Sequence, residues 1–248
     1  MKIKHYFAFE KELSQKFCDD MLNEKNWDIL RMDERDSAFA IEKDIESYEQ
    51  NCRNAQSYKN AAQKICDILR QENLINKRII SLGAGKGILE WHLKKNMPEL
   101  YIECTDYTLN AVEQLKKVFV HLDSAYQFDM LNGDYALLDS TGVLVLYRVS
   151  TEFCQEDWFK IFNKIYDAGI NYIIFVPTGL DRLRDIIKER LICAVNVLRG
   201  RKIIHCGWLY SEKEYLKMFT GGGYKGCQYK IKQKDYFDNT AVYLLERT

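Results

Sequence analysis

The stretch RIISLGAGKGILEWHL, residues 78–93, decides the fold of this chain. A run of apolar and β-branched residues leads directly into the loop GAGKG, residues 83–87, and helical spacing of apolar side chains follows. Glycines permit a tight turn and let the backbone approach a ligand that a Cβ would keep away. The start of the helix then presents unpaired N–H groups to that ligand. The stretch therefore predicts a strand, a ligand-binding loop and a helix.

Three kinds of nucleotide loop compete for this pattern. A phosphate-binding loop needs G-x-x-x-x-G-K-[ST], but Ile80 stands at its first glycine and Gly87 follows the lysine. The dinucleotide fingerprint G-x-G-x-x-G needs a glycine where the chain has Ile88, which disfavours an NAD-dependent oxidoreductase. The spacing found here, G-x-G-x-G, favours the loop of S-adenosylmethionine enzymes.

Strands and helices alternate on the C-terminal side of this loop. The expected strands are short and apolar on both faces, as in a parallel sheet that helices cover on each side; they span residues 78–82, 101–105, 125–128, 143–147 and 172–176. Two more, near 225–232 and 240–246, are expected to pair as an antiparallel hairpin. We predict an α/β fold with a doubly wound, mostly parallel seven-stranded sheet, an antiparallel C-terminal hairpin and ligands at the carboxyl ends of the strands.

The flanking segments predict additional parts. Residues 1–75 have a helical pattern and are expected to form an N-terminal helical cap, with one long amphipathic helix from Asp44 to Leu69. Residues 76–248 form the main domain, and an insertion at about 180–210 lies on its substrate side. That insertion is expected to hold a helix over 181–199 and a loop over 205–210.

The loop and the strand pattern resemble the class I, Rossmann-like S-adenosylmethionine-dependent methyltransferases over about residues 77–178 and again at the terminal hairpin. The resemblance implies that Gly83, Gly85 and Gly87 wrap the methionine part of the cofactor. It implies that Asp106, in ECTDYT, binds the ribose hydroxyls, which a carboxylate can accept together. Tyr107 then lies beside the adenine.

The same resemblance implies an adenine site after the third strand. Asp129, in YQFDML, meets the adenine amino group, and Met130 supplies a backbone N–H to the ring. Asp134 is a rival for this role. The chain departs from the family at Ser81, where an Asp or Glu is usual, and Ser81 is still expected to be one of the cofactor-binding residues. That departure supports a second hypothesis, a binding protein that kept the sheet and lost catalysis.

The acceptor side of the site rests on fewer signals. The fourth strand ends in LYRVSTEF, which places Tyr147, a candidate catalytic residue, and Arg148, a candidate substrate-binding residue, beside the reacting methyl group or the acceptor. It lacks the [DNS]-P-P-[YF] sequence that resembles nitrogen-directed nucleic-acid methyltransferases. His205, after the insertion helix, is a candidate catalytic base.

An aromatic and basic acceptor pocket completes the hypothesis. Tyr48 or Tyr58 would form its walls, and Arg199 and Arg201 would orient an anionic small molecule or glycan. The alternative is that the basic run to which they belong, the basic residues within 181–202, is a solvated helix face. We predict methyl transfer to such an acceptor, with S-adenosylmethionine as the cofactor.

Composition limits the other function classes. The 248 residues carry 36 basic and 36 acidic side chains, and this balance makes a nucleic-acid partner unlikely. The eight cysteines form no C-x-x-C pair, so no metal site is expected and a reducing compartment is favoured. No stretch has the length and apolarity of a membrane span, and the expected location is cytoplasmic.

Overall fold

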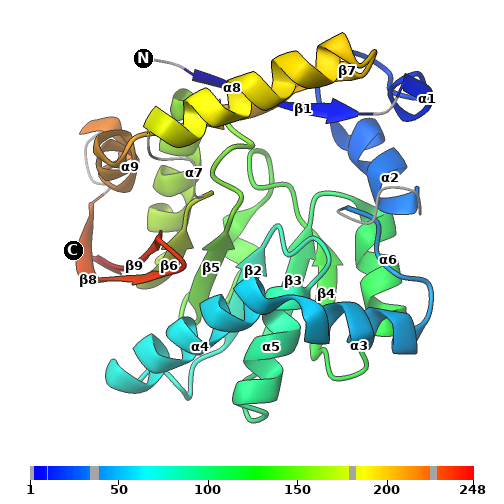
Figure 1. Cartoon of the computed structure of the whole chain (residues 1–248). Helices are drawn as coiled ribbons and strands as arrows, with labels where there is room; N and C mark the ends of the chain where they lie inside the picture. The colour runs from blue at the N-terminus through cyan, green and yellow to red at the C-terminus, as the bar shows by residue number, and fades with distance from the viewer. Residues whose placement is uncertain (1–2, 10, 34–38, 179–182, 224–227) are drawn as a thin grey trace.

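The computed structural model describes residues 3–9, 11–33, 39–178, 183–223 and 228–248. Its centre is a sheet with helices on both faces (Figure 1). Seven strands form this sheet in the order β4-β3-β2-β5-β6-β9-β8. They are β2 (Ile79–Leu82), β3 (Ile102–Asp106), β4 (Ser124–Gln127), β5 (Val143–Tyr147), β6 (Tyr172–Val176), β8 (Tyr229–Phe237) and β9 (Thr240–Arg247).

The pairing of these strands confirms the predicted topology. β2 runs parallel to β3 and β5, while β9 runs antiparallel to both β6 and β8, so β9 alone is reversed among the seven. The hairpin closes through Asp238 and Asn239, whose φ angles of 44° and 64° are typical of a type I′ turn. The order of the strands reverses between β2 and β5, and ligands bind in open α/β sheets at such a point.

Helices cover the two faces of the sheet with separate apolar cores. One face holds α3 (Ile45–Asn54), α4 (Gln56–Gln71), α5 (Ile88–Asn96) and α6 (Leu109–Val118). The other holds α7 (Gln155–Asp167) and α9 (Glu212–Phe219). All four residues of β2 are buried, because helices lie on both sides of it.

The long helix expected from Asp44 to Leu69 is two helices. Asp44 caps the start of α3, where its side chain accepts a hydrogen bond from the Ser47 N–H, and Ala55 caps its end. Ala55 leaves the helical conformation with ψ at 70°, and α4 starts at the next residue. The apolar spacing continues across this break, so periodicity alone did not reveal it.

A second, two-stranded sheet lies over the carboxyl ends of the main strands. It pairs β1 (Ile3–Phe9) antiparallel with β7 (Lys202–Leu209), and α8 (Leu183–Leu198) lies beside β1 across the top of Figure 1. We call β1, β7, α8 and α2 (Glu24–Met32) the lid. The expectations of an all-helical N-terminal segment and of a loop over 205–210 were therefore wrong. The division of the chain at residue 75 stays a prediction.

A close backbone contact seats the lid on the main sheet. Gly207 of β7 has a φ of 126°, and a Cβ at this position would lie 1.6 Å from the carbonyl oxygen of Thr151. The next residue, Trp208, donates its N–H to the same oxygen at 2.7 Å. Only glycine lets β7 approach the segment after β5 so closely.

Short elements complete the described chain: α1 (Lys11–Ser14) and the 3-10 turns Tyr135–Leu137 and Gly221–Gly223. None of the helices in the described ranges has both the length and the apolar character that crossing a membrane requires.

Candidate functional site

A cavity of about 610 Å³ lies between the carboxyl ends of the central strands and the lid. The glycine loop, Asp106 at the end of β3 and Tyr147 at the end of β5 line it from the sheet. His5 of β1 and Cys206 of β7 line it from the lid. It therefore occupies the place where the topology predicts a ligand.

The glycine loop has the backbone that its sequence implies. Gly83, Gly85 and Gly87 have φ angles of 73°, 59° and 66°, in the left-handed region that favours glycine. A Cβ on Gly83 would lie 2.8 Å from Val149, and one on Gly87 would lie 2.7 Å from Leu115. Gly83 and Gly85 line the cavity, whereas Gly87 caps α5 behind it, so only the first two face a ligand.

Asp106 faces the cavity and braces the loop. Its Oδ2 accepts the Gly85 N–H at 2.9 Å, and its Oδ1 accepts the Thr108 N–H at 3.1 Å. The carboxylate is buried, and Arg31 lies 3.6 Å from Oδ2. Asp106, the residue expected to bind the ribose, is therefore held in place by a hydrogen bond from the glycine loop.

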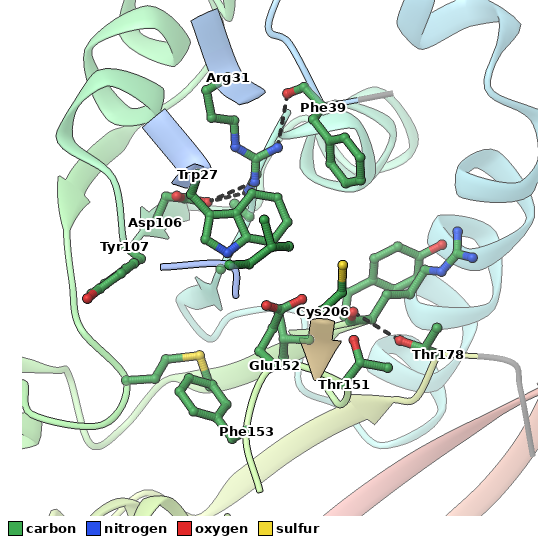
Figure 2. A pocket seen from close by; sticks show the side chains of 18 of the residues that line it. Trp27, Arg31, Phe39, Asp106, Tyr107, Thr151, Glu152, Phe153, Thr178 and Cys206 are labelled. Carbon is green, nitrogen blue, oxygen red and sulfur yellow. Dashed lines mark hydrogen bonds and ion pairs between the residues drawn. The ribbon is translucent and has the colours of Figure 1, made fainter. Parts of the chain in front are cut away.

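Arg31 and Trp27 enter this site from α2, and neither residue belongs to a sequence motif that would have identified it. Arg31 donates to the Phe39 carbonyl at 3.1 Å and lies 5.1 Å from the centre of the Trp27 ring (Figure 2). Its Nη2 is 3.0 Å from where a Cβ on Gly85 would be. The lid thus places a cation directly over the glycine loop.

The residues expected around an adenine lie together. Tyr107, Asp129 and Met130 all line the cavity. Asp129 accepts the N–H of Leu131 at 2.8 Å and that of Asn132 at 3.1 Å, so its carboxylate shapes the turn after β4. The rival Asp134 does not line the cavity and caps the next 3-10 turn instead.

Ser81 does not reach the cavity; it lies beneath the loop and donates its hydroxyl to Glu90 of α5 at 2.5 Å. Both side chains are buried, and burial raises the pKa of Glu90 to about 7. The buried acid that is usual at position 81 is thus supplied here from the helix. Sequence reasoning missed Glu90 because its helical position carries no motif.

Glu152 is a further acidic group that the sequence analysis missed. It follows β5, and Figure 2 shows its carboxylate among the side chains that line the cavity. The side chain is exposed to the cavity interior, yet protein surrounds the cavity, and this burial raises the pKa of Glu152 to about 8. Arg31 opposes the shift by favouring the carboxylate. Its position in STEF, just past a strand end, was the available signal.

The expected acceptor residues are divided between the cavity and the core. Tyr58, Tyr147 and Arg148 line the cavity, and the rings of Tyr58 and Tyr147 lie 5.4 Å apart. Tyr48 does not line it. It is fully buried in α3 and donates its hydroxyl to the Gly87 carbonyl at 3.3 Å, so it supports the loop from behind.

The basic run and His205 lie away from the cavity. Arg199 and Arg201 are exposed at the end of α8, where Arg201 donates to Asn196, as expected of a solvated face. Successive residues of a strand point to opposite faces, and Cys206 takes the cavity side. The Nε2 of His205 donates to the Gly207 carbonyl at 2.8 Å, and burial lowers its pKa. His205 is thus not placed to act as the base.

Metal chemistry has no obvious site in the part of the chain described. No group of three or more His, Cys, Asp or Glu side chains there is arranged to hold an ion.

Comparisons with known proteins identify the fold. No protein-family model matches the chain, and no curated protein matches its sequence. Solved structures do match. Human N-acetylserotonin methyltransferase in complex with S-adenosylmethionine is 13% identical, with a TM-score of 0.59, over 95% of this chain and 65% of that one. Magnesium protoporphyrin IX methyltransferase from Synechocystis, with bound S-adenosylhomocysteine, is 11% identical, with a TM-score of 0.55, over 77% and 84%.

A putative O-methyltransferase from Nostoc punctiforme is 14% identical, with a TM-score of 0.56, over 81% of this chain and 60% of that one. The chain thus spans less than two thirds of the length of the human and Nostoc proteins. The chain has the fold of the class I, Rossmann-like S-adenosylmethionine-dependent methyltransferases.

Proposed function

We propose that this protein transfers the methyl group of S-adenosylmethionine to a small-molecule acceptor. The observation that carries the proposal is the cavity in which Gly83, Gly85 and Asp106 meet the end of β5 beneath a lid. S-adenosylmethionine or S-adenosylhomocysteine is bound in the human and Synechocystis structures of this fold. When bound, this cofactor supplies a methyl group on a sulfonium, and the protein has to align an acceptor with it.

The residues on the sheet side fit such a cofactor. Gly83 and Gly85 expose backbone without a Cβ, and Asp106 at the end of β3 can accept the two ribose hydroxyls. Arg31 lies near the same carboxylate, so the ribose and the guanidinium would share Asp106. Tyr107 and Met130 would flank the adenine.

Glu152 fits the positive charge of the cofactor. In the free protein the raised pKa, about 8, leaves this side chain mostly protonated at neutral pH. A cation bound in the cavity would stabilise the carboxylate form and lower that pKa. Cofactor binding would therefore release a proton, and affinity would rise with pH up to about 8.

The proposed acceptor side is aromatic. Tyr58, Tyr147, Phe39 and Phe153 line the cavity together with Arg148. A flat small molecule fits such walls better than a polymer. An anionic acceptor or a glycan end would have to meet Arg148, Arg31 or Lys86, because Arg199 and Arg201 lie outside.

Calorimetric titration tests the proposal directly. We expect S-adenosylhomocysteine and S-adenosylmethionine to bind once per chain and NAD not to bind. Titrations in buffers of different ionisation enthalpy should show proton release near pH 7, which Glu152→Gln abolishes. Binding of NAD instead would favour an oxidoreductase. Binding without transfer of labelled methyl to any component of a metabolite extract would favour the inactive binding protein.

A further inference from the structure

His5 and Glu189 form a dyad at the roof of the cavity. The His5 Nδ1 lies 2.5 Å from Glu189 Oε1, joining β1 to α8 across 184 positions of sequence. Both side chains are largely buried, with 8% and 13% of their surface exposed. A carboxylate beside one ring nitrogen makes that nitrogen the donor, so the proton resides on Nδ1.

The other nitrogen of His5 is available to a ligand. His5 lines the cavity, and its Nε2 makes no hydrogen bond to the described residues. With the proton held on Nδ1, Nε2 carries a lone pair. An imidazole oriented in this way can accept a proton from a group in the cavity.

Burial of the carboxylate argues against a purely structural contact. Oε2 of Glu189 is buried and has no hydrogen-bond partner among the described residues. A buried carboxylate oxygen without a partner costs stability. Retaining such a group is understandable where a positive charge develops on the neighbouring imidazole during a reaction.

The register of the lid brings His5 close to the reacting side of the sheet. His5 is the β1 partner of Gly207, the residue whose missing Cβ lets β7 touch the Thr151 carbonyl. Thr151 and Glu152 follow β5 and line the cavity beside Tyr147. The dyad is thus anchored where the lid meets the end of β5.

We infer that His5 is the general base of the reaction, that Glu189 positions it, and that the methyl acceptor is therefore a hydroxyl, of the aromatic type that the cavity walls fit. This inference rests on the proposed methyl transfer. The hydroxyl proton passes to Nε2 of His5 while the oxygen forms a bond to the methyl carbon. The sulfur–methyl bond breaks, and its electron pair stays on sulfur. The positive charge lost from sulfur reappears on the imidazolium, beside Glu189.

The two other candidate bases, His205 and Glu152, fit this role less well. His205 uses its Nε2 within its own strand and faces away. Glu152 is mostly protonated at neutral pH and would be ionised chiefly when it faces the cofactor's charge. A base is needed for a hydroxyl acceptor and is dispensable for sulfur or amine acceptors, which explains the link between the dyad and the acceptor class.

The first test needs no acceptor. Nuclear magnetic resonance of the isotope-labelled ring nitrogens reports the tautomer of each neutral histidine, and His5→Gln identifies the signals of His5. We expect the Nδ1–H tautomer in the wild type and its loss in Glu189→Leu. The Nε2–H tautomer in the wild type would overturn the inference, because Nε2 would then have no lone pair to accept a proton.

The second test uses unsubstituted phenol and para-nitrophenol, which is largely ionised at mildly alkaline pH, with labelled S-adenosylmethionine. His5→Asn should lower kcat for phenol by about 100-fold or more, with much less effect on para-nitrophenol and none on the affinity for S-adenosylhomocysteine. His205→Asn, on the same lid, is the matched control and should keep the wild-type rate.

The outcomes separate the two proposals. A wild-type protein that does not bind S-adenosylhomocysteine contradicts the proposed function itself. A protein that binds it and methylates neither phenol contradicts the acceptor class, and an equal loss on both phenols contradicts the role of His5 as a base.

Discussion

The two walls of the cavity are built in opposite ways. The sheet wall comes from the ends of the central strands, from the glycine loop to the segment after β5, and its apolar side chains belong to the two cores of the main sheet. The lid wall joins β1 to β7 and contacts the sheet through the backbone of Gly207 and the side chain of Arg31. The difference teaches that the proposed cofactor site depends on local backbone geometry, whereas closure of the cavity depends on a few long-range contacts.

The largest expected effect is on lid seating. In Gly207→Ala the new Cβ would lie 1.6 Å from the Thr151 carbonyl oxygen, at a φ of 126°. Overpacking and backbone strain together should lower the free energy of unfolding by roughly 3–5 kcal/mol. Urea unfolding measures this. Gly200→Ala is the control, because its φ of 79° is also strained but no atom lies within 4 Å, so its loss should be about 1 kcal/mol. Equal losses would mean that lid seating does not require this contact.

The next largest expected effect is on the pH dependence of stability, and it comes from Glu90, whose carboxyl group is buried beneath the glycine loop. The pKa of Glu90 is about 7 in the folded protein against a model-peptide value of 4.5, so the folded protein favours the neutral acid. The contribution of Glu90 to the free energy of unfolding is therefore fully present below pH 4.5 and is lost as the pH rises to about 7. Glu90→Gln should therefore match the wild type near pH 4 and be more stable by on the order of 2–3 kcal/mol at pH 8. Thermal unfolding across this range measures the difference. The exposed Glu113→Gln on α6 should show no such trend, and a pH-independent difference at Glu90 would contradict its raised pKa.

Cofactor affinity should depend on the carboxylate at the end of β3. Asp106→Ala removes charge-assisted acceptors for the ribose and should weaken S-adenosylhomocysteine binding by about 1.5–3 kcal/mol, measured by calorimetry. Asp134→Ala, which alters a nearby aspartate outside the cavity, should leave the affinity unchanged. The opposite order of the two effects would move the nucleoside site away from β3.

The smallest expected effects distinguish a residue that supports the glycine loop, Tyr48, from residues that would contact the acceptor. Tyr48→Phe removes a 3.3 Å hydrogen bond to the Gly87 carbonyl, which also accepts the Trp91 N–H. The free energy of unfolding should fall by about 0.5–1.5 kcal/mol, with no change in acceptor KM. Arg199→Ala with Arg201→Ala should change neither quantity. A strong rise in KM from either replacement would restore these residues to the acceptor pocket.

The sequence was informative wherever local geometry determines function. Gly83, Gly85 and Asp106 face one cavity because a parallel strand, a glycine turn and a helix can be assembled in few ways. The seven strands could be predicted for the same reason. The end of the first hairpin strand was misplaced: it was expected near residue 232, but β8 continues to Phe237 and the chain turns at Asp238.

The lid could not be predicted in this way. β1 pairs with β7, which lies about 200 residues later in the chain, and no pattern within residues 3–9 identifies β7 as its partner strand. The same holds for His5, Arg31 and Glu189, whose roles arise from distant contacts. His205 was chosen by its place in the sequence, and alternation along β7 places Cys206 in the cavity instead.

The central claim is that the cofactor binds in the cavity between the sheet wall and the lid. Hydrogen exchange of the wild-type protein with and without S-adenosylhomocysteine tests this claim most directly, because it reports on both walls in one experiment. We predict slower exchange at the loop of residues 83–88, at 106–108 and at 129–132, together with slower exchange in β1 and β7 of the lid. Unchanged exchange at the glycine loop, or protection confined to surfaces away from the cavity, would contradict the account.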